Sequence, residues 1–197
     1  IMPALFSSLK LPMSATDFSS LNLSAEQLTV LDSLGYKQMT AVQAQSLPLI
    51  LQGKDLIAQA KTGSGKTAAF ELRRLGRGIP NLKLVMLCGG KPLGPQIASL
   101  EYGAHIVVGT PGRIQDHLKK ATLKLNKVKT VVLDEADRML DMGQGPDVLM
   151  ALATIKSKFQ AGLFSATLAG SGVRIFAEEL LNDPQEIHIN AANQLAE

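Results

Sequence analysis

The sequence has one cysteine, no tryptophan and few aromatic residues, which make up 4% of its 197 residues. A single cysteine cannot form an intramolecular disulfide, so a small disulfide-stapled scaffold is excluded. The three histidines and the cysteine are not spaced as metal ligands usually are, which argues against a zinc site. The scarcity of aromatic side chains also argues against recognition of nucleic-acid bases by stacking on an open sheet.

Long apolar runs are also absent. None approaches the roughly 20 residues that a membrane-spanning helix needs, and the N-terminus lacks the basic start and apolar stretch of a secretory signal. These absences predict a cytoplasmic protein with no membrane partner. A formal charge of +3 permits a polyanionic partner without requiring one. A hydrophobic content of 46% is enough for one good core, so we expect a single domain over 17–197 after a weakly ordered leader over 1–16.

Short runs rich in branched residues alternate with helical patterns, which is typical of an α/β fold with a mostly parallel sheet and helices on both faces. Strands are predicted at 55–59, 82–88, 105–109, 130–134, 162–165 and 186–189. Helices are predicted at 24–34, 41–51, 65–75, 112–119, 146–155 and 172–181. Ser24 and Gln27 have the spacing of a capping box, and Gly35 is placed to end that helix.

The run from Ala60 to Thr67, AKTGSGKT, is the most informative part of the sequence and follows an apolar segment. A strand that enters a glycine-rich turn and then a helix presents backbone N–H groups and the positive helix end to phosphate. Lys66 is expected to contact the β- and γ-phosphates, and the Thr67 hydroxyl to bind Mg²⁺. Ala60 replaces the first glycine of the usual pattern at little physical cost. The plainer alternative is a turn with a chance Lys-Thr pair. The residues expected to hold the nucleotide are Ala60, Lys61, Thr62, Gly63, Ser64, Gly65, Lys66 and Thr67.

A second chemical cluster follows the apolar run 131–133, where three acids, Asp134, Glu135 and Asp137, lie within four residues. Side chains at the end of a parallel strand lie at the carboxyl edge of the sheet, where such folds bind ligands. Asp134 is suited to hold Mg²⁺, largely through water, and Glu135 to orient and deprotonate an attacking water. Asp137 is expected to be a relay. Clustered acids in a surface turn are the alternative.

Together, AKTGSGKT, the tetrad Asp134-Glu135-Ala136-Asp137 and Ser165-Ala166-Thr167 resemble the N-terminal RecA-like domain of a DEAD-box RNA helicase. The resemblance covers about 18–189. It includes 35–43, which is similar to the family's adenine-reading Q motif, and the segments Gly89-Gly90 and 110–113. The residues around the phosphate loop and around CGG and GTPGR are closest to a bacterial subgroup that acts on large-subunit ribosomal RNA.

The resemblance implies an ATP-dependent RNA helicase that uses ATP and Mg²⁺ and unwinds short RNA duplexes by ATP-driven closure of two domains, in ribosome assembly. The implied partners are RNA and a second RecA-like domain, with the protein otherwise a monomer. Glu135, Lys66 and Asp134 would be the catalytic residues. Nothing after Ser165-Ala166-Thr167 resembles a second RecA-like domain with its arginines, so this part alone is expected to have little or no activity.

Residue roles in adenine recognition also follow from the resemblance. It implies that Gln43 hydrogen-bonds the adenine edge, that Tyr36 stacks on the ring and that Phe18 supports this pocket. An amide can pair a donor and an acceptor with adenine, so ATP would be selected over GTP. From the residues alone, Tyr36 is expected to be a core or interface aromatic and Gln43 a solvated helix residue.

Coupling and RNA contacts form the last implied set. The resemblance implies that Ser165 and Thr167 hydrogen-bond toward Asp137 and link the nucleotide site to the RNA face, although helix capping by these hydroxyls is equally good chemistry. The basic stretch 113–129 fits an electrostatic track for RNA or simply a solvated helix and loop. The implied contacts to RNA phosphates, which position RNA without reading its sequence, are Gly89, Gly90, Thr110, Gly112 and Arg113.

One departure from the family pattern is large. Between Phe70 and Glu71 the family carries a further strand with the motif Pro-Thr-Arg-Glu-Leu, roughly thirty residues, which this sequence lacks. Either the sequence joins two pieces across an omitted segment, which we favour, or the protein has a real internal deletion. Loss of a central parallel strand would open a gap in the sheet and expose apolar faces. Two other functions therefore stay open: a different P-loop enzyme, and a non-catalytic RNA-binding or regulatory module.

Overall fold

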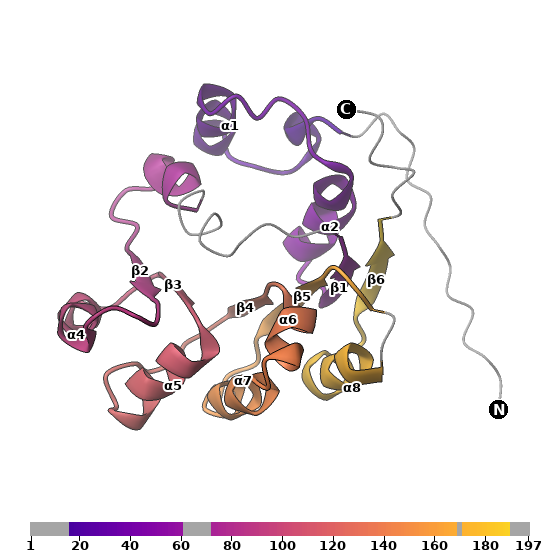
Figure 1. The fold of residues 1–197 in the computed structure, drawn as a ribbon. Helices are drawn as coiled ribbons and strands as arrows, with labels where there is room; N and C mark the ends of the chain where they lie inside the picture. The colour runs from indigo at the N-terminus through magenta and orange to yellow at the C-terminus, as the bar shows by residue number, and fades with distance from the viewer. Residues whose placement is uncertain (1–15, 61–71, 169–170, 190–197) are drawn as a thin grey trace.

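The computed structural model describes residues 16–60, 72–168 and 171–189 (Figure 1). Its elements in chain order are η1 (Phe18–Ser20), α1 (Ala25–Ser33), α2 (Ala41–Leu51), β1 (Leu56–Gln59), η2 (Gly76–Gly78), β2 (Leu84–Leu87), α4 (Leu93–Glu101), β3 (Ile106–Gly109), α5 (Pro111–Lys119), β4 (Thr130–Leu133), α6 (Ala136–Asp141), α7 (Gly145–Leu152), β5 (Gln160–Ser165), α8 (Ser171–Leu180) and β6 (Gln185–His188). The predicted leader apart from Thr16, and the predicted phosphate loop apart from Ala60, lie outside the described residues.

Every pair of described strands is parallel, as the alternation of strands and helices predicts. Four strands form one sheet in the order β4-β5-β1-β6, and β2 and β3 form a separate pair. Figure 1 shows α6, α7 and α8 along one face of the larger sheet, with α1 and α2 on the opposite side, and α5 packs against the β2–β3 pair. The predicted α/β architecture with helices on both faces is therefore confirmed.

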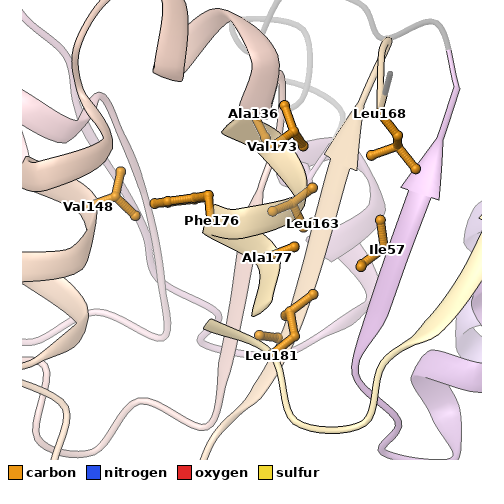
Figure 2. Packing of buried hydrophobic residues seen from close by; sticks show 10 residues of the cluster. Ile57, Ala136, Val148, Leu163, Leu168, Val173, Phe176, Ala177 and Leu181 are labelled. Atoms are coloured by element: carbon orange, nitrogen blue, oxygen red, sulfur yellow. The ribbon is translucent and has the colours of Figure 1, made fainter. Parts of the chain in front are cut away.

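The core lies on both faces of β1, because its side chains alternate between them. Ile57 belongs to the cluster formed with α6, α7 and α8, in which Leu163 and Ala177 are fully buried (Figure 2). Leu56 and Ala58 point to the other face and pack with Ile187 against α2. A strand buried on both faces needs the continuous apolar sequence that 56–58 provides.

Two helices were not predicted from the sequence. α4 begins at Leu93 with Gly94 and Pro95 in its first turn, and Pro92 before it offers no side-chain cap, so its start resembles a loop. α6 has six residues and follows directly on the acidic turn. The capping box of Ser24 and Gln27 is present as predicted. In the described part of the chain, no helix is long and apolar enough to cross a membrane.

The sheet is divided between β3 and β4. β3 pairs only with β2 and β4 only with β5 among the described strands. Val132 in β4 is 61% exposed, although a strand inside a parallel sheet normally has both faces covered. α5 and α7 bridge the two parts, since the Gln115 Nε2 group donates to the Asp147 carbonyl oxygen at 2.6 Å. The gap in the sheet and the exposed apolar residue that are expected when a central strand is missing are thus present in the fold.

Gly109, at the end of β3, provides a test of how closely β2 and β3 approach. A Cβ atom there would lie 2.7 Å from the Leu87 carbonyl oxygen and 2.9 Å from Ile114 Cδ1. The carbonyl cannot withdraw easily, because it accepts the Thr110 N–H at 3.1 Å. We expect Gly109→Ala to reduce the free energy of unfolding by about 1–3 kcal/mol.

Gly112, in the first turn of α5, is the matched control because a Cβ there meets nothing within 4 Å. Gly112→Ala should leave stability unchanged or raise it by up to about 1 kcal/mol. Urea unfolding followed by circular dichroism measures both. Equal midpoints for the two variants would contradict the close approach.

Candidate functional site

The carboxyl ends of β1, β5 and β4 meet at one edge of the larger sheet. Gln59 lies opposite Ser165 in the β1–β5 register, and the Ala60 N–H donates to the Ser165 carbonyl oxygen at 2.9 Å. Leu133 lies opposite Leu163, so Asp134 follows its strand at the same edge. The sequence-predicted phosphate loop therefore starts beside the sequence-predicted acids. Lys61 to Thr67, including the predicted ligands Lys66 and Thr67, lie outside the described residues.

Glu135 turns the chain sharply from β4 into α6. It has φ 56° and ψ 46°, the left-handed region that non-glycine residues rarely adopt, at a cost of order 1–3 kcal/mol. Its backbone N–H donates to Asp134 Oδ1 at 3.0 Å, and its Oε2 accepts from Arg138 Nη1 at 2.9 Å. These contacts hold the two carboxylates next to each other. Strain of this kind is concentrated at functional sites in proteins.

The environment of Asp134 disfavours an isolated charge. Burial raises the pKa of its carboxyl, and the nearby carboxylates of Glu135 and Asp137 raise it further, while the hydrogen bond from the Glu135 N–H acts in the opposite direction. A cation bound there would relieve this repulsion. Among the described residues, no group of three or more His, Cys, Asp or Glu side chains could hold a metal unaided. The donor set fits Mg²⁺ bound mainly through phosphates and water, as this ion prefers.

Asp137, Ser165 and Thr167 are brought together as predicted, across 28 and 30 residues of sequence. Asp137 Oδ2 accepts both the Thr167 N–H and the Thr167 Oγ1 hydroxyl at 3.0 Å. Ser165, which is fully buried, accepts the Asp137 N–H and donates to the Thr167 carbonyl oxygen at 2.8 Å. Burial acts to raise the pKa of Asp137, but the hydrogen bonds from Thr167, Arg138 and Ser165 outweigh it and lower the pKa below its ordinary value.

Phe18 and Tyr36, the predicted adenine-pocket residues, line one hollow of about 310 Å³ together with Asp17, Ser19, Leu28, Leu31, Asp32 and Lys37. Phe18 is buried there with Leu21 and Met39. Gln43 does not line this hollow. Its side-chain Oε1 accepts the Thr40 backbone N–H at 2.9 Å, and the Gln43 backbone N–H donates to Thr40 Oγ1. Gln43 therefore completes a capping box at the start of α2. The sequence had suggested only a solvated helix residue or an adenine contact.

The five predicted RNA contacts lie at the carboxyl ends of β2 and β3. Gly89 and Gly90 follow β2, and Gly90 has φ 73°, which favours glycine. Thr110, Gly112 and Arg113 begin α5. The Arg113 side chain is only 11% exposed, because its Nη1 donates to the Lys91 carbonyl oxygen at 2.9 Å and to Gln96 Oε1 at 3.1 Å. Arg113 thus ties the start of α5 to the loop after β2, and its contact with phosphate stays a prediction.

Gln96, which sequence reasoning missed, joins these loops from α4. Its Nε2 donates to the Cys88 carbonyl oxygen at 3.1 Å, next to Gly89, while its Oε1 faces Arg113 and lies 3.0 Å from His117 Nε2. Arg113 can only donate and the carbonyl can only accept, so the amide has one possible orientation. The His117 Nε2 must then carry a hydrogen. A polar residue on the apolar stripe of Leu93 and Leu100 was the signal that could have identified Gln96.

His117 is fully buried at the base of this cluster. Burial is the main cause that lowers the pKa of its imidazole, and the Arg113 charge adds to it. Its Nδ1 lies 2.9 Å from Thr122 Oγ1. In a neutral ring Nε2–H donates to Gln96 and Nδ1 is left to accept from the Thr122 hydroxyl, whose single hydrogen the His117 carbonyl oxygen also faces at 3.2 Å. This agrees with a structural role for the histidine rather than metal binding.

The sequence model of the DEAD/DEAH box helicase family matches residues 40–78 and 71–175. The chain is 43% identical to the ATP-dependent RNA helicase DbpA of Escherichia coli, over 91% of this chain and 46% of that protein. It is 38% identical to the DEAD-box ATP-dependent RNA helicase CshA of Bacillus cereus, over 89% of this chain and 39% of that protein. The chain therefore spans about half the length, or less, of these curated relatives.

Solved structures agree with the sequence comparisons. A DEAD box protein from the hyperthermophile Methanococcus jannaschii is 35% identical with a TM-score of 0.81, over 89% of this chain and 56% of that one. A hypothetical ATP-dependent RNA helicase from Sulfolobus tokodaii is 32% identical with a TM-score of 0.78, over 85% and 57% of the two chains. The fold is therefore the RecA-like fold of these proteins.

The relatives also contain residues that this chain lacks. The alignment with DbpA is 213 residues long and includes 91% of the 197 residues here, about 179, so about 34 of its positions have no residue in this chain. The family model also matches in two segments that meet at 71–78. This is where the sequence suggests that roughly thirty residues are missing.

The hydrogen bonds from Thr167 to Asp137 allow a pH test. In Thr167→Val, Asp137 loses the hydroxyl donor, so its pKa should rise relative to the unsubstituted chain. Thr167→Ser keeps the hydroxyl and should keep the low pKa. Because the folded-state pKa is depressed, the stabilisation is present above the unfolded value of about 4 and is lost as pH falls through the folded value.

NMR titration of the Asp137 side-chain carboxyl carbon measures the three pKa values directly. Urea unfolding should show a deficit for Thr167→Val of about 0.5–1.5 kcal/mol at pH 7, which shrinks toward acid pH. An unchanged pKa in the valine variant would show that the hydroxyl does not set it.

Proposed function

Because the chain belongs to the DEAD/DEAH box helicase family, we propose that it is the ATP- and RNA-binding N-terminal RecA-like part of an ATP-dependent RNA helicase. The observation that supports this most directly is the meeting of Ala60, Asp134 and Ser165 at one sheet edge. We propose further that the whole protein is a cytoplasmic monomer with a second RecA-like domain and that it unwinds short duplexes of ribosomal RNA during ribosome assembly.

The residues present fit ATP with Mg²⁺. The chain leaves the buried strand β1 beside Ser165. In parallel sheets of this type, a phosphate loop begins at such a strand end. Asp134 offers a carboxylate whose charge is crowded by two others, a suitable partner for a hydrated divalent ion. Lys66 and Thr67 complete the proposed site from the sequence. When bound, Mg²⁺ offsets the negative charge of the phosphates during their transfer.

Glu135 is the proposed general base. Its Oε2 is held by Arg138 at 2.9 Å, and its side chain is 18% exposed, so the carboxylate is fixed in direction yet reachable by water. The left-handed turn places it beside Asp134 without a helix in between. Deprotonation of an attacking water by Glu135 would then occur next to the ion-binding carboxylate.

Asp137 is the proposed link between the nucleotide and RNA. It lies in the first turn of α6, two residues after Glu135, and accepts hydrogen bonds from the backbone N–H and the hydroxyl of Thr167 in the loop after β5. A shift of the loop after β4 is therefore transmitted to the loop after β5. Gly89, Gly90, Thr110, Gly112 and Arg113 would bind the RNA backbone through amides, a hydroxyl and a guanidinium.

A non-catalytic RNA-binding or regulatory module is the second candidate. It is supported by the missing segment and the divided sheet. Titration of the 197-residue chain with a fluorescent N-methylanthraniloyl ATP and Mg²⁺ separates the two candidates. Saturable binding that ATP displaces better than GTP supports the helicase assignment. Absence of nucleotide binding favours the module.

Adenine selection by Gln43 can be separated from helix capping, because Gln27 makes the same capping box in α1. Both Gln43→Ala and Gln27→Ala remove a capping box and should cost about 1 kcal/mol of stability or less. Only Gln43→Ala should weaken ATP binding, by roughly tenfold, and bring ATP and GTP affinities together. Competition against the fluorescent nucleotide measures this. Similar losses of affinity in both variants would indicate that capping alone is responsible.

Asp134→Asn should stabilise the nucleotide-free chain and weaken its binding of nucleotide. The raised pKa means that the charged carboxylate opposes folding as pH rises through the folded-state pKa, and an amide removes this effect. The Tm should therefore increase at pH 7.5 and match the unsubstituted chain below the ordinary carboxyl pKa of about 4. The Mg²⁺-dependent part of nucleotide affinity should fall by about tenfold to a hundredfold. Thermal melts without nucleotide test the first effect, and melts with ATP in the presence and absence of Mg²⁺ test the second. A lower Tm of the nucleotide-free variant at pH 7.5 would contradict the electrostatic argument.

A further inference from the structure

Two loops at the amino edge of the larger sheet carry five lysines and no acid. The first loop, 121–129, leads from α5 into β4, and the second, 153–159, leads from α7 into β5. Both loops enter parallel strands, so they lie opposite to the carboxyl edge where the predicted nucleotide contacts emerge. We propose that these loops form a second surface that binds the phosphate backbone of RNA. The residues of this lysine surface are Lys124, Lys127, Lys129, Lys156 and Lys158.

Hydrogen bonds hold the two loops side by side. Ser157 Oγ donates to the Val128 carbonyl oxygen at 3.0 Å, across 29 residues of sequence, and the Gln160 N–H donates to the Lys129 carbonyl oxygen at 2.9 Å. The helices that lead into the loops, α5 and α7, also lie next to each other (Figure 1). Ser157 lies between the two lysines of its own loop. The lysines of both loops therefore belong to one surface.

Apolar residues anchor the first loop and turn its lysines outward. Leu123 is buried in the cluster formed with β2, and Leu125 packs against the same cluster. The Leu123 N–H donates to the His117 carbonyl oxygen at 3.3 Å, and the Val128 N–H donates to the Leu125 carbonyl oxygen at 3.1 Å. The lysines that alternate with these residues are exposed. These contacts fix the loop, which reduces the entropy that it would lose on binding a ligand.

The lysine surface has no partner of opposite charge among the described residues. All five lysines are exposed, and none takes part in the ion pairs of the described chain. Five positive charges also exceed the formal net charge of +3, so the rest of the chain is net negative. Soluble surfaces normally intersperse charges of both signs, because like charges repel one another. A polyanion bound to the two loops would relieve this repulsion.

Helix dipoles do not account for these positions. Lys119 and Lys120 lie at the C-terminal end of α5, where a cation stabilises a helix, so their charge has a structural reason. The five lysines of the surface lie at least four residues beyond the last residue of α5 or α7. The effect of the dipole is confined to the last turn of a helix. Their charge is therefore available for binding.

The side-chain types favour a nucleic-acid backbone over a protein partner. Neither loop contains arginine, tyrosine or tryptophan, which anchor protein interfaces, and lysine is depleted in such interfaces. Phe159, the one aromatic residue of the two loops, packs against the core cluster. Lysine binds phosphate as a point charge and reads no base. The choice of RNA as the polyanion rests on the proposed function, and this surface would bind RNA beyond the segment held at the carboxyl edge.

Fluorescence anisotropy of the 197-residue chain with fluorescein-labelled oligouridine, about 20 nucleotides long, tests the proposal. Replacement of all five lysines by glutamine should weaken binding at about 100 mM KCl by tenfold or more. The slope of log affinity against log salt should become shallower by about 2 to 3.5, since each phosphate contact contributes about 0.7 for a single strand. Replacement of all five by arginine keeps the charge and should keep the slope. An unchanged slope in the glutamine variant would overturn the proposal.

Acetylation of lysines by N-acetoxysuccinimide, read by mass spectrometry, locates the RNA on the unsubstituted chain and so does not depend on the folding of any variant. RNA should protect the five lysines and leave Lys37, exposed beside the predicted adenine hollow, unprotected. Lys91, next to Gly90, reports binding at the carboxyl edge. Protection of Lys91 alone supports the proposed function and refutes the lysine surface. Protection of the five lysines without Lys91 supports the surface and contradicts the proposed RNA contacts.

Poly-L-glutamate is the control polyanion, because it carries negative charge without phosphate. It should displace the labelled RNA less effectively than unlabelled oligouridine of equal total charge. Equal displacement, with the same five lysines protected from acetylation, would indicate an acidic protein partner and overturn the assignment of RNA. Absence of RNA binding by the unsubstituted chain would overturn the lysine surface as well, while the nucleotide titration would still test the ATP site by itself.

Discussion

Parallel pairing of β5 between β4 and β1 is the constraint on which the candidate site depends. Its register sets Leu133 opposite Leu163 and Gln59 opposite Ser165, so that three chain segments leave the sheet at the same edge. Both faces of β1 and β5 are buried, which makes a slip of one residue very costly because every apolar side chain would change face. The position of Asp134 relative to Ala60 is therefore set by the packing of the core strands and not by contacts within the loops.

The loops at that edge are then held by buried polar groups. In the larger sheet Ser165 binds both Asp137 and Thr167, and in the smaller one Gln96 binds Arg113, His117 and the Cys88 carbonyl. Removal of one partner leaves a buried group unsatisfied, at about 1–3 kcal/mol. No buried side-chain nitrogen or oxygen of the described residues lacks a partner. The described loops after β2, β4 and β5 are thus held by polar side chains.

The sequence was sufficient for the strands, because short apolar runs between helical patterns have few other solutions. It also identified the Asp137–Thr167 contact, although only through a family resemblance. It could not show that Glu135 adopts a left-handed conformation, since this depends on the direction in which the chain enters α6. The capping box of Thr40 and Gln43 was missed although it has the same spacing as that of Ser24 and Gln27. Gln96 was missed because Gly94 and Pro95 make the start of α4 resemble a loop in the sequence. The role of this buried amide can be identified only when its partners Arg113 and His117, 17 and 21 residues away in the sequence, are located in space.

The divided sheet has a mechanical consequence for coupling. In the described residues the predicted nucleotide contacts at strand ends belong to the four-stranded sheet, and the predicted RNA contacts follow β2 and β3. A continuous parallel sheet would connect them through its hydrogen-bonded ladder, which resists relative movement of its strands. Here the connection passes through the packing of α5 on α7 and the Gln115–Asp147 hydrogen bond. Helix packing permits small sliding movements that a ladder does not. A displacement at Asp137 would therefore reach Thr110 and Arg113 weakened, and the proposed coupling of ATP to RNA would be tighter in a continuous sheet.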